Sequence, residues 1–202
     1  MKKILSILAV AFAFTRAIFA YGDTLSINYD MPLLFWNDSS YEYVQRNIGF
    51  NADYKVMGDS IGFQSMVGIS MPYELERTTT SSGYVKQYKL NSSEDWIVLR
   101  TFFGIVFEPV YTDMVEFYIT PGFGVDVESV STSSTELDNI TFGAGIDIST
   151  YVDLFDGAGF TAGCLFEYQF FSIENNFTAD TIKRRKVGNF LFAPRAGMSI
   201  KL

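Results

Sequence analysis

The side chains that could carry chemistry in this chain are carboxylates and guanidinium groups, because the 202 residues include no histidine. That composition excludes serine–histidine and cysteine–histidine catalysis, histidine metal sites and the usual general base at neutral pH. Two carboxylate pairs could still exchange protons: Glu116 with Asp126, and Asp147 with Glu167. We interpret all four instead as partners of basic side chains. The sequence therefore predicts no enzyme activity, no metal site and no cofactor.

These acids lie in segments that alternate apolar and polar residues. In residues 114–127, Val115, Phe117 and Phe123 share one parity, while Glu116 and Asp126 share the other. Successive side chains of a strand point to opposite faces, so the segment is a strand with one apolar face and one polar face. Strands of soluble proteins usually have about 5–6 residues, whereas a tilted strand needs about 9–11 to cross a bilayer. The length favours a membrane strand.

Eight segments repeat this alternation, at residues 24–33, 44–54, 61–71, 96–107, 115–127, 140–152, 160–170 and 189–202. Their apolar parity carries one charge, Arg46, although 19% of the chain is charged. A lysine or arginine that faces lipid at mid-depth costs roughly 2–4 kcal/mol, and about 0–1 kcal/mol at the interface. Arg46 stands near the end of its segment, where a charge is tolerable.

The opposite parity gathers the charges, and we predict that it lines the interior of a barrel. The expected interior charge cluster consists of Asp30, Arg100, Glu116, Asp126, Asp147, Glu167 and Arg195, with Asp53 and Lys201 on the same parity. An unpaired buried charge is very costly, so both arginines need partners. We expect Arg195 to pair with Glu167 or Asp30. For Arg100, the acids within reach are Glu116, Asp126 and Asp147.

Two interpretations of this cluster remain open. With six acids and three bases, a wet interior would form the cation-favouring constriction of a narrow pore. Alternatively, the charges form an ion-pair plug, because the interiors of barrels this small are nearly filled by side chains.

The connectors alternate in length. Residues 55–60, 108–114 and 153–159 are short, whereas residues 34–43, 72–95, 128–139 and 171–188 are long. Short turns at one end and long loops at the other are typical of outer-membrane barrels. Both chain ends should then lie at the short-turn, periplasmic end. Pro121 and Pro194 fall within strands, where a proline lacks a donor, and we expect a β-bulge at each.

A basic run stands in the fourth long connector, at Lys183, Arg184, Arg185 and Lys186. One interpretation is an anion contact, with lipid phosphates of the envelope or with a polyanion. The other is a solvated charge run, as most such runs are.

The first 20 residues have the features of a signal peptide. Lys2 and Lys3 precede an apolar stretch of residues 4–14, and Ala20 is a plausible last residue before cleavage. Removing residues 1–20 leaves 12 basic and 23 acidic residues, a net charge of 12 − 23 = −11. Such an acidic chain argues against a nucleic-acid partner. The single cysteine, Cys164, has no partner for an internal disulfide.

The pattern predicts an all-β fold, an eight-stranded antiparallel up-and-down transmembrane β-barrel over residues 21–202. It resembles the small outer-membrane barrels that include the OmpA transmembrane domain, OmpX and OmpW. Outward aromatic residues near the strand ends, such as Phe107 and Phe170, and a last strand that ends the chain carry the resemblance. Leu202 stands where such proteins usually have phenylalanine. The resemblance implies outer-membrane lipids as surroundings, insertion by the outer-membrane assembly machinery, and a narrow, mostly filled interior.

Three functions fit these expectations. The first is a narrow, porin-like channel for small solutes through a polar, ion-paired interior. The second is a surface barrel that transports nothing and binds an extracellular partner through its long loops. The third is a secreted, lipocalin-like barrel with its apolar face turned inward around a lipid.

Overall fold

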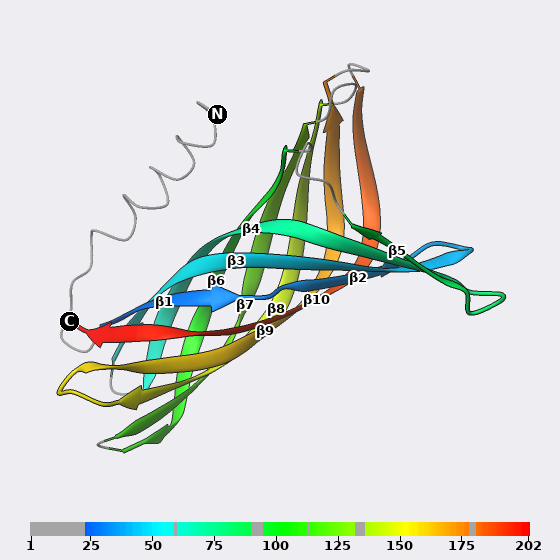
Figure 1. Ribbon diagram of the computed structural model, residues 1–202. Coiled ribbons are helices and arrows are strands. Elements are labelled where there is room, and N and C mark those ends of the chain that lie inside the picture. Colours follow the sequence, from blue (N-terminus) through cyan, green and yellow to red (C-terminus); the bar gives the residue numbers. More distant parts are fainter. Residues whose placement is uncertain (1–22, 59, 90–94, 113, 132–135, 178–180) are drawn as a thin grey trace.

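A computed structural model describes residues 23–58, 60–89, 95–112, 114–131, 136–177 and 181–202 (Figure 1). The expected signal peptide, residues 1–20, lies outside them. The strands are β1 (Thr24–Asp30), β2 (Leu33–Asn37), β3 (Tyr41–Met57), β4 (Ile61–Thr79), β5 (Val85–Lys89), β6 (Asp95–Tyr111), β7 (Val115–Ser131), β8 (Glu136–Asp153), β9 (Ala158–Asn176) and β10 (Thr181–Lys201). No helix in these ranges has the length and hydropathy needed to cross a membrane.

The strands close into an antiparallel ring with eight positions. Consecutive long strands pair as neighbours from β3 to β10, and β6 follows β4 directly in the ring. The first position is shared by β1 and β2, which each pair with both β3 and β10. β5 pairs with the end of β4, outside the ring. The predicted eight-stranded up-and-down barrel is therefore confirmed.

The proline positions differ from expectation, because neither carries a bulge. Pro121 pairs in register with Ile146, and Pro194 pairs in register with Cys164. Instead, the neighbouring strand loses its regular pairing next to each proline. The first barrel strand breaks after Asp30, where the Met31 nitrogen donates to the carbonyl of Pro194 (3.1 Å). Between β6 and β7, no pairing is found for Ile105 and Val106, the two residues that lie across from Pro121 and Thr120. Register shifts occur elsewhere, between Arg46 and Asn47, Phe107 and Val110, Phe142 and Gly143, and Lys186 and Asn189.

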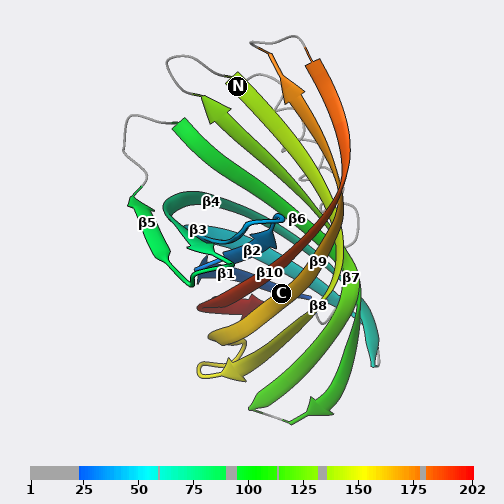
Figure 2. The same cartoon turned by 90° about the vertical axis from the view of Figure 1, so that its right-hand side faces the viewer.

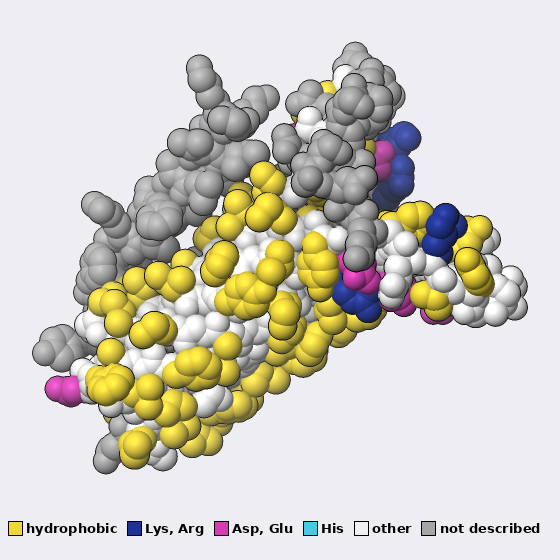
Figure 3. All heavy atoms as spheres, in the orientation of Figure 1, with side chains coloured by type: hydrophobic (Ala, Val, Ile, Leu, Met, Phe, Trp, Pro, Cys, Tyr) yellow, Lys and Arg dark blue, Asp and Glu magenta, His cyan; other side chains and the backbone are white. Residues whose placement is uncertain are grey.

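The apolar faces of the strands form the outer wall. Ile27, Phe123 and Met198 are 64%, 68% and 75% exposed, whereas Asn28 and Asp147 are buried inside the ring. Figure 3 shows apolar side chains as a broad band across the face of the barrel in view. This orientation is that of a membrane barrel and the reverse of a lipocalin-like barrel, whose apolar face surrounds a ligand.

The two ends of the barrel differ. At the short-turn end, the Leu202 nitrogen donates to the carbonyl of Asp23 (2.8 Å), so the described chain ends meet there as expected. At the other end the ring opens, because β4 and β6 stop pairing at Ser70–Val98 and β10 and β2 stop at Phe190–Phe35. Beyond those two seams, one sheet consists of β2, β3, β4 and β5 and the other of β6 to β10, and they diverge (Figures 1 and 2). We call this end the mouth.

Candidate functional site

Arg195 occupies the centre of the interior. From β10 it donates to Asp147 on β8 (Nη2–Oδ2 2.6 Å) and lies 3.4 Å from Asp53 on β3. The prediction that Arg195 pairs with Glu167 or Asp30 is wrong, even though Asp30 is its in-register neighbour on β1. Barrel strands are tilted, so a long side chain reaches residues two strands away rather than its paired position.

The same network includes a base that the sequence did not place inside. Lys55 donates to Asp53, and Gln64 donates to both Asp53 and Asp147 (2.9 Å each). Residue 55 fell in an expected turn, but β3 continues to Met57 and turns the lysine inward, where it is buried.

Arg100 forms a second interior ion pair. Its Nε and Nη2 donate to Asp126 Oδ1 and Oδ2 at 3.0 and 3.1 Å, in a bidentate contact between paired positions of β6 and β7. Asp126 was one of the three acids expected within reach, and it also accepts from Gln169 (2.9 Å). Glu167 is buried nearby, with neither carboxylate oxygen hydrogen-bonded to a protein group. Asp30 accepts from Asn51 (3.1 Å).

A third group of interior charges lies at the short-turn end. Glu116 accepts from the Tyr118 hydroxyl and from Lys201 Nζ. The ammonium of Lys201 lies 5.0 Å from the ring centroid of Tyr151. All seven charges of the predicted cluster are therefore inside the barrel, but in separate groups rather than around one constriction.

Two apolar clusters lie inside the barrel between these charges. The first consists of Met66 on β4, Phe102 on β6, Leu165 on β9, and Leu191 and Ala193 on β10, with Leu34 packed against it. The second consists of Val106, Tyr118 and Tyr151, with Met57 of β3 packed against it. Because β4 and β6 are not neighbours of β9 and β10 in the ring, the first cluster spans the interior from wall to wall. The second does the same between β3 and β7–β8.

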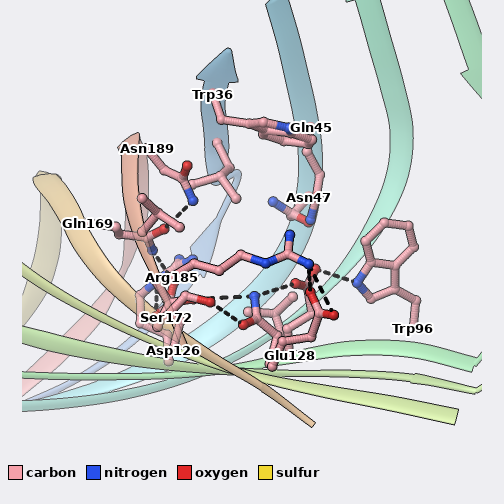
Figure 4. Close-up of a pocket in the computed structure, with 17 residues that line it drawn as sticks. Trp36, Gln45, Asn47, Trp96, Asp126, Glu128, Gln169, Ser172, Arg185 and Asn189 are labelled. Carbon is pink, nitrogen blue, oxygen red and sulfur yellow. Dashed lines mark hydrogen bonds and ion pairs between the residues drawn. The ribbon is translucent and has the colours of Figure 1, made fainter. Parts of the chain in front are cut away.

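Above the first cluster, a cavity of about 260 Å³ lies in the mouth (Figure 4). Trp96 donates to Glu128 across its wall (2.7 Å), and Asn189 donates to Gln169 (3.2 Å). Trp36 also lines it. The cavity therefore presents indole rings and aliphatic side chains together with amides and charged groups, a mixed lining that suits a ligand with both apolar and polar surface.

One sheet of the mouth carries a row of aromatic and basic side chains on its inner face. Trp36, Tyr43, Arg77 and Lys86 are paired in register across β2, β3, β4 and β5, so all four share the face that lines the cavity. The rings of Trp36 and Tyr43 stack at 5.1 Å. The Arg77 guanidinium lies 4.5 Å from the ring centroid of Tyr41. We call these four residues the aromatic-cation row.

The β2–β3 turn supports this row. The backbone N–H groups of Ser40 and Tyr41 each donate to Asp38 Oδ1 (2.8 Å). They hold the pKa of the Asp38 carboxyl below its usual range, the Ser40 bond being the larger cause. The Tyr43 hydroxyl donates to the other oxygen of Asp38 (3.2 Å). Asp38 is thus ionised at neutral pH and orients the Tyr43 ring.

The basic run lies in a strand and not in a loop. Residues 183–186 belong to β10 and pair in register with β9, so their side chains alternate between the two faces. Lys183 and Arg185 face inward and both meet Glu174, at 4.0 and 3.1 Å. Arg184 and Lys186 face outward. The residues were placed correctly in sequence, but their secondary structure was missed because a polar, charged strand does not show the apolar alternation.

The fold matches solved structures, although no protein-family model and no curated protein matches the sequence. Neisserial surface protein A (NspA) is 14% identical over 92% of this chain and 100% of its own, with a TM-score of 0.57. AlkL, solved in DMPC bilayers, is 14% identical over 92% of this chain and 93% of its own, with a TM-score of 0.52. Ail of Yersinia pestis, in complex with the heparin analogue sucrose octasulfate, is 14% identical over 90% of this chain and 100% of its own, with a TM-score of 0.50. The chain thus has the fold of the small outer-membrane β-barrels, as its sequence predicted.

Proposed function

We propose that this protein is an outer-membrane barrel with a closed interior, which binds a glycan bearing anionic groups at its mouth. The observation that supports this proposal most directly is the wall-to-wall apolar cluster beneath the mouth cavity. A cavity with a closed floor holds a ligand, whereas a permeation path needs a continuous polar passage.

The chemistry of the mouth indicates the class of ligand. Aromatic rings such as Trp36 present apolar faces, and amides such as Asn189 supply both donors and acceptors, which suits the mixed surface of a sugar ring. Arg77 and Lys86 add positive charge on the inner face of the sheet. The acids opposite are already engaged, Glu174 by Arg185 and Glu128 by Trp96.

The binding proposal is tested with the whole protein in lipid nanodiscs and a fluorescent sulfated tetrasaccharide. We expect saturable binding that Arg77→Gln weakens about tenfold, because a hydrogen bond to a charged group contributes about 1.5–3 kcal/mol. Arg46→Gln is the matched control, since Arg46 lies on the outer face of the same sheet and pairs with Glu74 and Glu76. Equal affinities for the two variants, or no binding by the unaltered protein, would overturn the glycan proposal.

A narrow channel is the second candidate. The charged interior and several buried polar atoms without protein partners, such as the Glu167 carboxylate oxygens, favour it. Planar-bilayer recordings distinguish the two: the closed interior predicts no unitary openings from correctly folded protein. Reproducible cation-selective steps would replace the closed-barrel proposal with the channel.

A further inference from the structure

The strand geometry divides the basic run into two pairs with different surroundings. Lys183 and Arg185 point into the mouth and share Glu174. Arg184 and Lys186 point outward and are exposed, and their in-register neighbours on β9 are Ile173 and Phe171. The outward pair therefore stands beside apolar residues where the inward pair has an acid.

The outer wall shows why this arrangement is unusual. Arg46, the other outward-facing arginine near the mouth, contacts Glu74 at 2.8 Å and Glu76 at 3.2 Å. No ion pair of this kind is found for Arg184 or Lys186 among the described residues. The outward acid of β8, Asp138, is in register with Asn175, one row further toward the β9–β10 turn.

The height of the pair on the barrel is that of a membrane interface. On the outer face, Phe142 and Phe171 lie in the same row as Lys186, and Phe190 lies further along β10 toward the short-turn end; aromatic residues usually mark this level. At this boundary, a cation that faces outward meets lipid headgroups.

We propose that Arg184 and Lys186 form a binding site for the phosphate of an anionic membrane lipid, in the leaflet at the mouth. Residues two apart on a strand are separated by about 6.6–6.8 Å, so both can contact one headgroup. The guanidinium of Arg184 suits bidentate contact with phosphate oxygens, and Lys186 adds a point charge. The acyl chain would lie along Phe171 and Phe190 on the outer face. This site is on the outer wall and does not depend on the glycan proposal.

The strand itself supplies a matched test. Two double variants each remove one arginine and one lysine from this run. The outward variant is Arg184→Gln/Lys186→Gln, and the inward variant is Lys183→Gln/Arg185→Gln. Each is placed in nanodiscs that contain mixtures of phosphatidylglycerol and phosphatidylcholine, and native mass spectrometry counts the phosphatidylglycerol molecules retained. We expect the outward variant to lose about thirtyfold in phosphatidylglycerol affinity and the inward variant to lose none, since each of the two basic residues near an anionic lipid surface contributes about 1 kcal/mol.

Three results would overturn the proposal. Equal losses in both variants would indicate general electrostatic attraction, and no loss in either would indicate that the outward pair binds no lipid. Displacement of phosphatidylglycerol by inorganic phosphate at the same concentration would indicate an ion site without a role for the acyl chain. Urea unfolding of both variants shows whether either loss comes from misfolding.

Discussion

The short-turn half of the barrel and the mouth are built from the same strands but differ in strand pairing and in the polarity of the outer face. In the short-turn half, the ring is closed, the outer face is apolar, and charges such as Arg195 and Asp147 are paired inside. In the mouth, two seams interrupt the ring and the outer face becomes charged at Arg46, Glu74 and Glu76. Alternation persists throughout, and only the identity of the outward residues changes.

That difference shows what each half is surrounded by. Lipid cannot hydrogen-bond to an open sheet edge, so strands inside a membrane must stay paired. Water can, which allows the sheets of the mouth to separate and expose a polar cavity between them. The change in the outer face near Arg46 therefore marks the upper limit of the membrane-spanning wall.

The largest expected effect is the loss of the central base. Arg195→Met leaves Asp147 buried without its cation, removes one of the two bases that contact Asp53, and should reduce the free energy of unfolding by roughly 3–5 kcal/mol. Urea unfolding from lipid vesicles measures it. Arg46→Met, at a partly exposed pair in the mouth, should cost about 1 kcal/mol or less. Similar costs for the two variants would remove the distinction between the halves.

The next largest loss of stability is expected from a truncated side chain in the first apolar cluster. Leu165→Ala removes a fully buried side chain from the first cluster and should cost roughly 2–5 kcal/mol, with the lower part of that range expected if the cluster relaxes. Leu154→Ala, in an exposed short turn, is the control for the same chemical change. A Leu165→Ala protein as stable as the unaltered protein would indicate that the side chains of the first cluster are not closely packed.

Inward glycines give a smaller effect that depends on what each one touches. A Cβ on Gly122 would lie 2.2 Å from the carbonyl oxygen of Phe103, which is backbone and cannot move away cheaply. The three atoms nearest to a Cβ on Gly143 all belong to the Glu167 side chain, whose carboxylate can rotate. We expect Gly122→Ala to cost about 1–3 kcal/mol in the same urea assay and Gly143→Ala to cost less. The reverse order would contradict the packing described for this wall.

The smallest effect is expected in the mouth. Arg77→Gln removes the cation stacked on Tyr41 and should cost about 0.5–1 kcal/mol, because such contacts are weak at exposed sites. Limited proteolysis should cleave the β4–β5 hairpin faster in this variant, while its urea midpoint changes little. A large drop in the midpoint would show that the mouth contributes to the stability of the whole barrel.

The sequence predicted the faces of the strands well and their contacts poorly. Residues such as Glu116 and Phe123 were assigned to the correct side because strand alternation has a period of two, which is visible locally. The partner of Arg195 was not predictable, because it depends on strand tilt and stagger. Lys55 and the residues of β10 near Arg184 were missed, because their strands extend past the apolar pattern that revealed them.

The sequence by itself determined that the chain forms an antiparallel barrel whose strands carry their apolar residues on one face and their charges on the other. Only the tertiary structure decided that the apolar face turns outward, which acid meets which base, where apolar clusters cross the interior and where the ring opens into a mouth. The reason is that these features depend on residues from strands that are not neighbours, such as Met66 and Leu165. Their distances are set when the tilted sheet closes on itself, and no local pattern records that closure.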